Sequence, residues 1–278
     1  MVKSSLRTKL QAGDFVKVVG IDRVTKARFT EVAGHLGFDV VWFDMEHRPH
    51  GYEVIDRLSL ACRATGIDLM VGICKNGYTS AMRALKFGAN GIMIPHCCGA
   101  AEARQWAEWP GFSPQGKGGF DDAGGDADYS LTDALHYLLT QNNEIFLAVQ
   151  IEDQEAVDSV DEIAAVDGVD VLFVGPADVS VSYGVPFQHQ HPAMQRAFDK
   201  VANAAEKNCK WWGTVTETPD LAQLELDRGA RMVTCADDHF LLVRGLQHAS
   251  RQFQNIGIRK QWSRAEWAKS QHADISRG

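Results

Sequence analysis

Two carboxylates, Glu152 and Asp178, stand where neighbouring strands of a buried parallel sheet would end. Glu152 directly follows the apolar run 146–151, and Asp178 follows the run 171–174 and a Gly-Pro-Ala turn. Acidic side chains at the carboxyl ends of neighbouring strands are typical ligands of an oxygen-rich divalent metal site. Each residue alone could instead cap a helix or fix a loop. Together they predict a site for one divalent cation, Mg²⁺, Mn²⁺ or Co²⁺.

The residues around this pair could hold a substrate. Backbone N–H groups of the turn at Ala177 could bind a carboxylate. A 2-oxo acid could fill the open metal positions through its carboxylate and keto oxygens, and the cation would stabilise the enolate that forms when a C–C bond breaks or an α-proton leaves. Gln150 faces the same way as Glu152, because the two residues are two apart on a strand. Gln150 could hold a metal-bound water or orient substrate, or it is a satisfied polar residue of a barrel layer.

A third apolar run, 40–43, is followed by Asp44, Glu46 and His47. A histidine after a strand is often a surface or structural residue, but this reaction needs a group that titrates near neutral pH. His47 is therefore predicted to be the general base, acting directly or through a metal-bound water, and Asp44 to set its tautomer. A metal and a base at the mouth of a strand barrel predict a lyase.

Two more groups stand at predicted strand ends. His96 follows the fourth strand and could contact substrate, although a structural imidazole is the simpler interpretation. Asp237, Asp238 and His239 follow the eighth strand, where a helix-start cap is the ordinary interpretation of either aspartate.

The composition sets limits on the class of protein. The chain has 278 residues, 45% of them hydrophobic, and an α/β barrel of about 250 residues routinely forms one domain. The formal net charge of −8 argues against nucleic-acid binding, which needs clustered Lys and Arg. No run is long enough to span a membrane, and the N-terminus has no secretory apolar region. The six cysteines lack zinc-ligand or disulfide spacing, so a reduced, cytoplasmic protein is expected.

Short apolar runs alternate with segments of helical spacing along the chain. The candidate strands are Phe15–Val19, Val40–Phe43, Leu69–Ile73, Gly91–Ile94, Ile145–Ile151, Val169–Val174, Lys210–Thr214 and Arg231–Thr234. The candidate helices are Ala27–Leu36, Tyr52–Ala64, Ser80–Phe87, Glu102–Trp109, Leu131–Gln141, Asp153–Val166 and Pro192–Glu206. Parallel crossovers need a helix-sized connection, and strands buried on both faces are continuously apolar. We predict one (β/α)8 TIM barrel over residues 1–250, with a doubly wound sheet as the competing fold.

Two segments depart from this alternation of strands and helices. The glycine-rich segment Gly111–Tyr129 is either a lid or a flexible insertion, since loops of this length are uncommon inside a compact domain. The polar C-terminal extension 251–278 contains Trp262 and Trp267, which suggest docking on a neighbouring subunit.

With these residues in place, the chain resembles the HpcH/HpaI family of metal-dependent class II pyruvate aldolases. The resemblance covers about residues 16–246. It rests on Phe43-Asp-Met-Glu-His-Arg-Pro49, Gly88-Ala-Asn-Gly-Ile-Met-Ile-Pro95, Val149-Gln-Ile-Glu152, Val174-Gly-Pro-Ala-Asp-Val-Ser180 and Gly229-Ala-Arg-Met-Val233.

The resemblance implies a (β/α) barrel that forms a homo-oligomer, a hexamer or trimer, with an end helix exchanged between partners. It implies that Glu152 and Asp178 are the metal ligands and that His47 is the catalytic base. It also makes Gln150 a substrate or water contact, and it assigns the pyruvate carboxylate to backbone groups at Ala177 and Asp178. Members cleave 4-hydroxy-2-oxo acids to pyruvate, or an analogue, plus an aldehyde, and several decarboxylate oxaloacetate.

The chain departs from the family pattern at two places. The family has an arginine that steadies the keto oxygen and the developing enolate, and this chain has Gly72 at the aligned position. The family also has an aspartate supplied by a neighbouring subunit, and this chain has Lys86 there. The glycine-rich segment also lacks the family's arginine, and Lys117 is its nearest cation. Losing an oxyanion donor would cost about 10²–10³-fold in rate. If the reaction is unchanged, another cation could therefore take the place of the arginine. Arg23, after the first strand, is the better candidate for binding substrate, and Lys75 the other.

The sequence therefore predicts a metal-dependent carbon–carbon lyase that acts on a small 2-oxo acid and an aldehyde, through a metal-bound enolate. Two alternatives follow from Gly72. The first is a decarboxylase or other enolate enzyme with an atypical substrate, and the second is a barrel that binds a metabolite without catalysis. Neither nucleic acid nor a membrane is expected as a partner.

Overall fold

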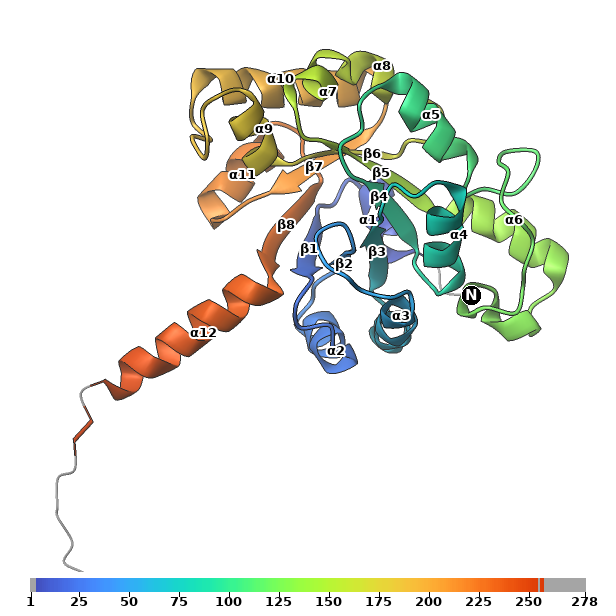
Figure 1. The fold of residues 1–278 in the computed structure, drawn as a ribbon, viewed down its shortest axis with the longest axis horizontal. Helices are drawn as coiled ribbons and strands as arrows, with labels where there is room; N and C mark the ends of the chain where they lie inside the picture. The colour runs from blue at the N-terminus through green and yellow to red at the C-terminus, as the bar shows by residue number, and fades with distance from the viewer. Residues whose placement is uncertain (1–3, 255, 258–278) are drawn as a thin grey trace, which may run out of the picture. The chain divides into compact units, whose positions relative to one another are not determined.

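The computed structural model describes residues 4–254 and 256–257, and its core is a closed barrel of eight parallel strands (Figure 1). The strands follow one another around the barrel in chain order: β1 (Val16–Ile21), β2 (Val40–Asp44), β3 (Asp68–Gly72), β4 (Gly91–Ile94), β5 (Phe146–Ile151), β6 (Val171–Val174), β7 (Trp211–Val215) and β8 (Met232–Asp237). All eight predicted strands are present, with ends shifted by a few residues. The predicted (β/α)8 barrel is confirmed, and the doubly wound sheet is wrong.

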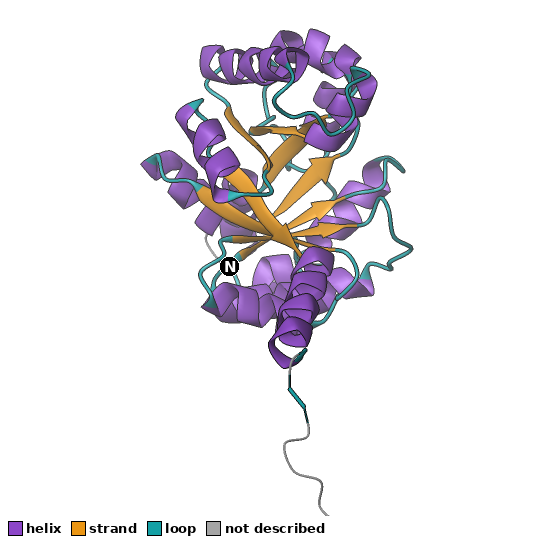
Figure 2. Ribbon diagram, turned by 90° about the vertical axis from the view of Figure 1, so that its left-hand side faces the viewer, coloured by secondary structure: helices purple, strands orange, loops and turns teal. Residues whose placement is uncertain are grey.

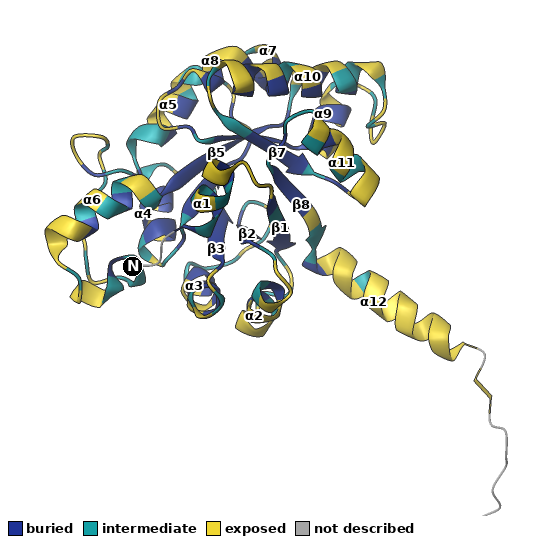
Figure 3. Cartoon of the chain, turned by 180° about the vertical axis from the view of Figure 1, so that it is seen from behind, coloured by how far each residue is buried: buried dark blue, intermediate teal, exposed yellow. Residues whose placement is uncertain are grey.

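Both faces of the barrel wall are apolar. On β2, Val40 packs in the barrel interior with Met70 and Phe173, whereas Val41 packs in the layer between strands and helices. Strands with two buried faces have continuous apolar runs, which made them recognisable in the sequence. Figure 2 shows the strands enclosed by helices, and Figure 3 shows buried strands inside helices with exposed outer faces.

The helices lie mostly between successive strands. They are α1 (Ser5–Ala12), α2 (Ala27–His35), α3 (Glu53–Thr65), α4 (Tyr78–Lys86), α5 (Ala100–Glu108), α6 (Ala134–Glu144), α7 (Gln154–Asp158), α8 (Val160–Ala164), α9 (Pro176–Ser182), α10 (Pro192–Lys207), α11 (Pro219–Asp227) and α12 (Asp238–Phe253), with a 3₁₀ segment, η1 (Gly125–Ser130). The predicted helix 153–166 is two helices. The Ser159 hydroxyl donates to the Glu155 carbonyl at 2.9 Å, a side-chain bond that competes with regular helix geometry.

Helices α1, α9 and α11 were not predicted, and of α12 only the start was expected, from a cap at Asp237 or Asp238. Helix α9 is short and carries Ser and β-branched Val, which have modest helix propensity. Its buried residues, Pro176, Val179 and Ser180, and its contacts with α10 hold it in place. The prediction failed there because tertiary context outweighed local preference.

Helix α1 closes the amino-terminal end of the barrel. Leu6 and Leu10 are buried in the interior cluster. The first residue of β3, Asp68, accepts hydrogen bonds from the Ser4 hydroxyl and the Leu6 N–H, both at 2.7 Å. Arg7 pairs with Asp170, just before β6, at 2.9 Å. With this end closed, the carboxyl ends of the strands remain as the open mouth.

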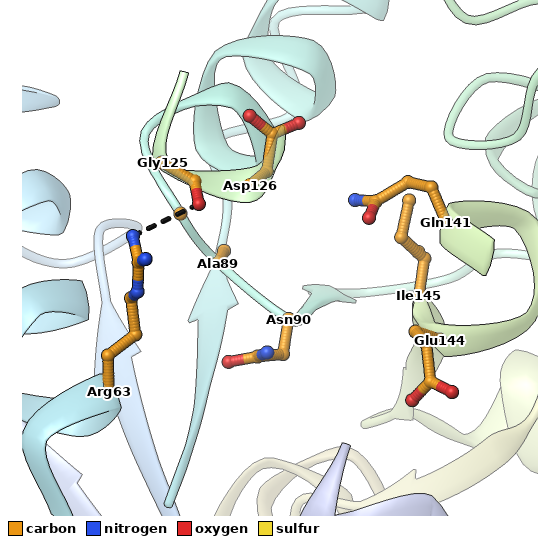
Figure 4. Close-up of a pocket in the computed structure, with 9 residues that line it drawn as sticks. Arg63, Ala89, Asn90, Gly125, Asp126, Gln141, Glu144 and Ile145 are labelled. Carbon is orange, nitrogen blue, oxygen red and sulfur yellow. Dashed lines mark hydrogen bonds between the residues drawn. The ribbon is translucent and has the colours of Figure 1, made fainter. Parts of the chain in front are cut away.

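The glycine-rich segment is anchored to three helices. The Lys86 ammonium, at the end of α4, donates to the Asp121 carbonyl, to Asp126 and to the Tyr137 hydroxyl of α6. Arg63 of α3 donates to the Gly125 carbonyl at 3.1 Å, beside a small cavity that Figure 4 shows. The segment is thus held at η1, and its role as a lid stays a prediction.

The barrel unit ends at Phe240, and a second compact unit begins at Leu241, so α12 runs from one into the other. The predicted boundary at residue 250 stays a prediction. Trp262 and Trp267, on which the docking prediction rests, lie outside the described residues. Within the described residues, no helix has the length and apolar character needed to cross a membrane.

Candidate active site

The predicted chemical groups gather at the carboxyl ends of the strands. Asp44 is the last residue of β2, and Glu152 follows β5 directly. Asp178 lies in the first turn of α9, immediately after β6. Strands β5 and β6 are hydrogen-bonded neighbours, with Ile151 paired to Val174. The barrel therefore places the two predicted ligands at the same mouth.

Glu152 is a buried carboxylate, with 5% of its surface exposed. Its Oε1 accepts from the Gln150 amide at 2.7 Å, and its Oε2 accepts from the backbone N–H of His96 at 2.9 Å. Burial raises the pKa of Glu152 to about 7, the N–H and imidazole of His96 lower it, and the charges of Asp178 and Glu46 raise it. Glu152 and Asp178 therefore interact electrostatically across the mouth.

The local geometry fits a cation beside Glu152. A Cβ atom added at Gly175 would lie 2.6 Å from Glu152 Oε1, so only glycine leaves this carboxylate its position. A buried carboxylate among other acids is unfavourable unless a positive charge compensates it. A divalent cation held by Glu152 and Asp178 would supply that charge, and carboxylate oxygens are the ligands such ions prefer.

His47 is oriented by a carboxylate. Its Nδ1 lies 2.9 Å from Asp44 Oδ2, and Asp44 Oδ1 accepts the Glu46 N–H at 2.8 Å. Partial burial lowers the pKa of His47, but the hydrogen bond and charge of Asp44, with the charges of Glu46 and Glu152, raise it on balance. With Nδ1–H on Asp44, Nε2 is free to accept a proton. Asp44, Glu46 and His47 also offer ligand atoms within 4.8 Å of one another.

His96 lies between Glu152 and the Asp44–His47 group. Its imidazole lies 3.5 Å from Glu152 and 3.7 Å from Glu46, and its backbone has a φ of +43°. That left-handed conformation is uncommon for a residue with a side chain and often marks a functional loop. The signal in the sequence was its place one residue after Pro95, at the end of β4.

The cations proposed to replace the family arginine are paired with acids. Arg23 lies 2.7 Å from Asp22, and Lys75 lies 2.6 Å from Glu102. Asp238 fixes the loop of Arg23, because its carboxylate accepts the backbone N–H of that residue at 2.7 Å. A role for Arg23 in substrate binding stays a prediction.

The structure also shows the neighbours of three other predicted positions, Ala177, Asp237 and Lys86. Ala177 is exposed in the first turn of α9, where N–H groups have no partner within the helix. Asp237 accepts the Phe240 N–H at 2.9 Å, as the capping interpretation expected. Lys86 is 16% exposed and pairs within its own chain, with Asp126 at 3.3 Å.

Gly72 ends β3 directly opposite Asp44. A Cβ atom at this position would lie 2.9 Å from Trp42 Nε1. The indole ring thus borders the place to which the family arginine was aligned, and a larger residue there would have to displace it.

Comparison with known proteins decides the family. The family model described as "HpcH/HpaI aldolase/citrate lyase" matches residues 23–244. The chain belongs to this family. The predicted family, and with it the prediction of a carbon–carbon lyase of the class II aldolase type, is confirmed.

Similar proteins support this assignment. The chain is 29% identical to a hydroxypyruvate/pyruvate aldolase of Roseobacter denitrificans over 79% of its own length and 86% of the relative. It is 32% identical to a 5-keto-4-deoxy-D-glucarate aldolase of Shigella boydii over 75% and 80% of the two lengths. The crystal structure of an HpcH/HpaI aldolase from Desulfitobacterium hafniense superposes with a TM-score of 0.85 at 27% identity, over 92% of this chain and 99% of that one. These names do not favour the decarboxylase or the non-catalytic alternative.

Proposed function

We propose that this aldolase cleaves a 4-hydroxy-2-oxo acid to pyruvate, or a pyruvate analogue, plus an aldehyde. Two groups lie at one barrel mouth: the acids Glu152 and Asp178, and the hydrogen-bonded pair His47 and Asp44. This arrangement is the observation that carries the proposal. The names of two relatives, a 2-keto-3-deoxy-L-rhamnonate aldolase and a 5-keto-4-deoxy-D-glucarate aldolase, support a 2-oxo acid substrate.

Glu152 and Asp178 would hold a divalent cation such as Mg²⁺, Mn²⁺ or Co²⁺. When bound, the cation supplies Lewis-acid stabilisation of the negative charge that develops on the substrate's keto oxygen. The Gln150 amide holds Glu152 Oε1 in place at 2.7 Å. The first-turn N–H groups of α9 at Ala177 are available to the substrate carboxylate.

His47 moves the proton. In the cleavage direction its Nε2 takes the proton of the 4-hydroxyl group, and the C3–C4 bond breaks to release the aldehyde. The bonding electrons remain on the three-carbon fragment as the enolate of pyruvate, which then takes a proton at C3. Asp44 keeps Nδ1 protonated throughout and stabilises the imidazolium.

We also propose that the enzyme works in the cytoplasm as a homo-oligomer, a trimer or hexamer. The six cysteines are all free, as expected in a reducing compartment. Several large apolar side chains of α12 are exposed, among them Leu242, Leu246 and Phe253, and clustered exposed apolar residues often form an interface.

Deuterium entry into the methyl group of pyruvate, followed by proton NMR in D₂O with Mg²⁺, tests the central proposal. Wild-type enzyme should catalyse the exchange, and a chelator should stop it. Glu152→Gln should abolish it, because the site loses a negative ligand while the side chain keeps its size. Glu155→Gln, an exposed residue of α7, is the matched control and should exchange normally. Exchange that persists in Glu152→Gln or with the chelator would contradict the proposed site.

A further inference from the structure

Two arginines at the barrel mouth share one carboxylate. Asp22 directly follows β1, and its two oxygens lie 2.7 Å from Arg23 Nη1 and 3.1 Å from Arg48 Nε. Arg48 comes directly after His47, in the loop that follows β2, and β2 is the hydrogen-bonded neighbour of β1. The two guanidinium groups therefore lie side by side at the carboxyl ends of these strands, next to the proposed base.

A buried carboxylate fixes the loop that carries this pair. Asp238 is 1% exposed, and its Oδ2 accepts from the backbone N–H groups that follow β1. These are the N–H groups of Asp22 at 3.1 Å, of Arg23 at 2.7 Å and of Val24. Burial raises the pKa of Asp238, but the three N–H groups lower it on balance. The loop backbone thus compensates the charge of Asp238, and the arginines are left to Asp22.

Both guanidinium groups keep donors for a further acceptor. Arg23 uses Nη1 on Asp22, and Arg48 uses Nε on Asp22 and Nη1 on the His47 carbonyl, at 2.9 Å. A guanidinium has five N–H donors, and the others have no partner in the part of the chain that the structure describes. The two side chains are 43% and 35% exposed, so a ligand can reach them. One carboxylate does not balance two cations, and a further anion would.

Helix α2 adds positive charge at the same edge of the mouth. Asp22 is the single acid in the stretch 22–30, beside Arg23, Lys26 and Arg28. Lys26 is the N-cap of α2, the first turn has no acid, and no side chain caps the free N–H groups. A helix start of this kind attracts negative charge.

The aldehyde half of the substrate extends toward this edge. The closed strand order places β1 and β2 across the barrel from β5 and β6. In the proposed reaction the 2-oxo acid end lies at Glu152 and Asp178, and His47 takes the proton of the 4-hydroxyl group. The group attached to C4 therefore points past His47, toward Arg48 and Arg23.

We propose that Arg48 and Arg23 bind a carboxylate at the far end of the aldehyde half. The substrate is then a 4-hydroxy-2-oxo diacid, and the aldehyde that it releases is itself an acid. A guanidinium matches a carboxylate with two parallel hydrogen bonds, which gives geometric selectivity as well as charge. This inference rests on the proposed function. In the competing account, the two arginines only hold Asp22 and its loop.

A matched pair of aldehydes tests the site. Addition of pyruvate to 4-oxobutanoate is compared with addition to its methyl ester, which has the same chain without the charge. The wild type, with Mg²⁺, should show a kcat/KM at least about 10-fold higher for the acid. Arg48→Gln and Arg23→Gln should each lower this ratio about 10- to 100-fold, the effect of losing a hydrogen bond to a charged group. Because the ratio is taken within one variant, a general effect on His47 cancels.

Two further variants serve as controls. Arg48→Lys keeps the charge without the planar fork, so its ratio should lie between those of the wild type and Arg48→Gln. Arg104→Gln removes an exposed arginine of α5 and should keep the wild-type ratio. If Arg48→Gln fails to fold, Arg23→Gln carries the test, since the side chain of Arg23 bonds only to Asp22 within the described residues.

The outcomes separate this site from the aldolase function. Equal use of the acid and its ester by the wild type, or wild-type ratios in the arginine variants, would overturn the arginine site and leave the aldolase standing. A preference for glyceraldehyde 3-phosphate over glyceraldehyde, without one for the acid over its ester, would overturn the carboxylate and indicate a phosphate. A wild-type enzyme that neither adds pyruvate to an aldehyde nor exchanges its methyl protons would overturn both proposals.

Discussion

The charge of Asp44 matters for the pH at which His47 can act as a base. The base must be neutral, and its pKa is raised above the ordinary 6.5, since Asp44 and other acids outweigh partial burial. Activity should therefore be lost as the pH falls through a value above 6.5. The hydrogen bond at 2.9 Å also selects the tautomer, so Asp44 affects both the pKa and the orientation of the ring.

Asp44→Asn should reveal both effects. Removing the negative charge lowers the pKa of His47, so the acidic limb of the profile of kcat/KM against pH should move to lower pH. The maximal rate should fall by about 10²-fold or more, because an amide does not hold the imidazole in its reactive tautomer. Asp56→Asn, at an exposed residue of α3, is the control. An acidic limb at the wild-type position would argue that another group is the base.

At the scale of elements, the glycine-rich segment depends on Lys86. The ammonium lies 2.7 Å from the Tyr137 hydroxyl and 3.3 Å from Asp126, a carboxylate with 3% of its side chain exposed. Burial raises the pKa of Asp126, although Tyr137 and Lys86 lower it. Without Lys86 the buried carboxylate would keep the hydrogen bond from the Tyr137 hydroxyl but lose its cationic partner.

Lys86→Met should lower the free energy of unfolding by about 3 kcal/mol, the cost of removing one partner of a buried pair. Chemical denaturation measures this loss, and limited proteolysis should show faster cleavage near Gly116–Gly119. The double variant Lys86→Met/Asp126→Asn should recover part of the stability, because no buried charge is left. Cleavage and stability unchanged from the wild type would show that the segment is held by its other contacts.

Helix α1 is a second element whose effect can be measured. Leu6 is fully buried where α1 closes the barrel. Leu6→Ala should cost about 3 kcal/mol of stability through the cavity it leaves, whereas Gln11→Ala on the exposed side of the same helix should cost little. Equal midpoints of denaturation in the two variants would mean that α1 does not close the barrel in solution.

At the scale of the molecule, oligomer formation is the proposal to measure. Light scattering after size exclusion should give the mass of a trimer or hexamer. Leu246→Asp should reduce that mass, because a charge would be buried in the interface, and Gln247→Glu beside it should not. A monomeric wild type, or a Leu246→Asp variant with unchanged mass, would contradict an interface at this part of α12.

The barrel and the main acids could be read from the sequence because their signals are local. Strands buried on both faces are continuous apolar runs, and Glu152 directly follows such a run. Helix α9 gave no comparable signal, since its residues have modest helix propensity and it packs against α10, which is separate from it in the sequence. The surroundings of His96 could not be read from the sequence for a related reason, because its contacts with Glu46 and Glu152 cross from the end of β4 to the ends of two other strands.

The sequence by itself determined the fold class, the family and the candidate reactive residues, because each depends on residue types at fixed spacing. Tertiary structure decided which of these residues meet. It placed the His96 imidazole 3.5 Å from Glu152, turned Lys86 toward Asp126, and set the Trp42 N–H beside Gly72. Such contacts join residues on different strands and loops, and their geometry follows from how the barrel closes.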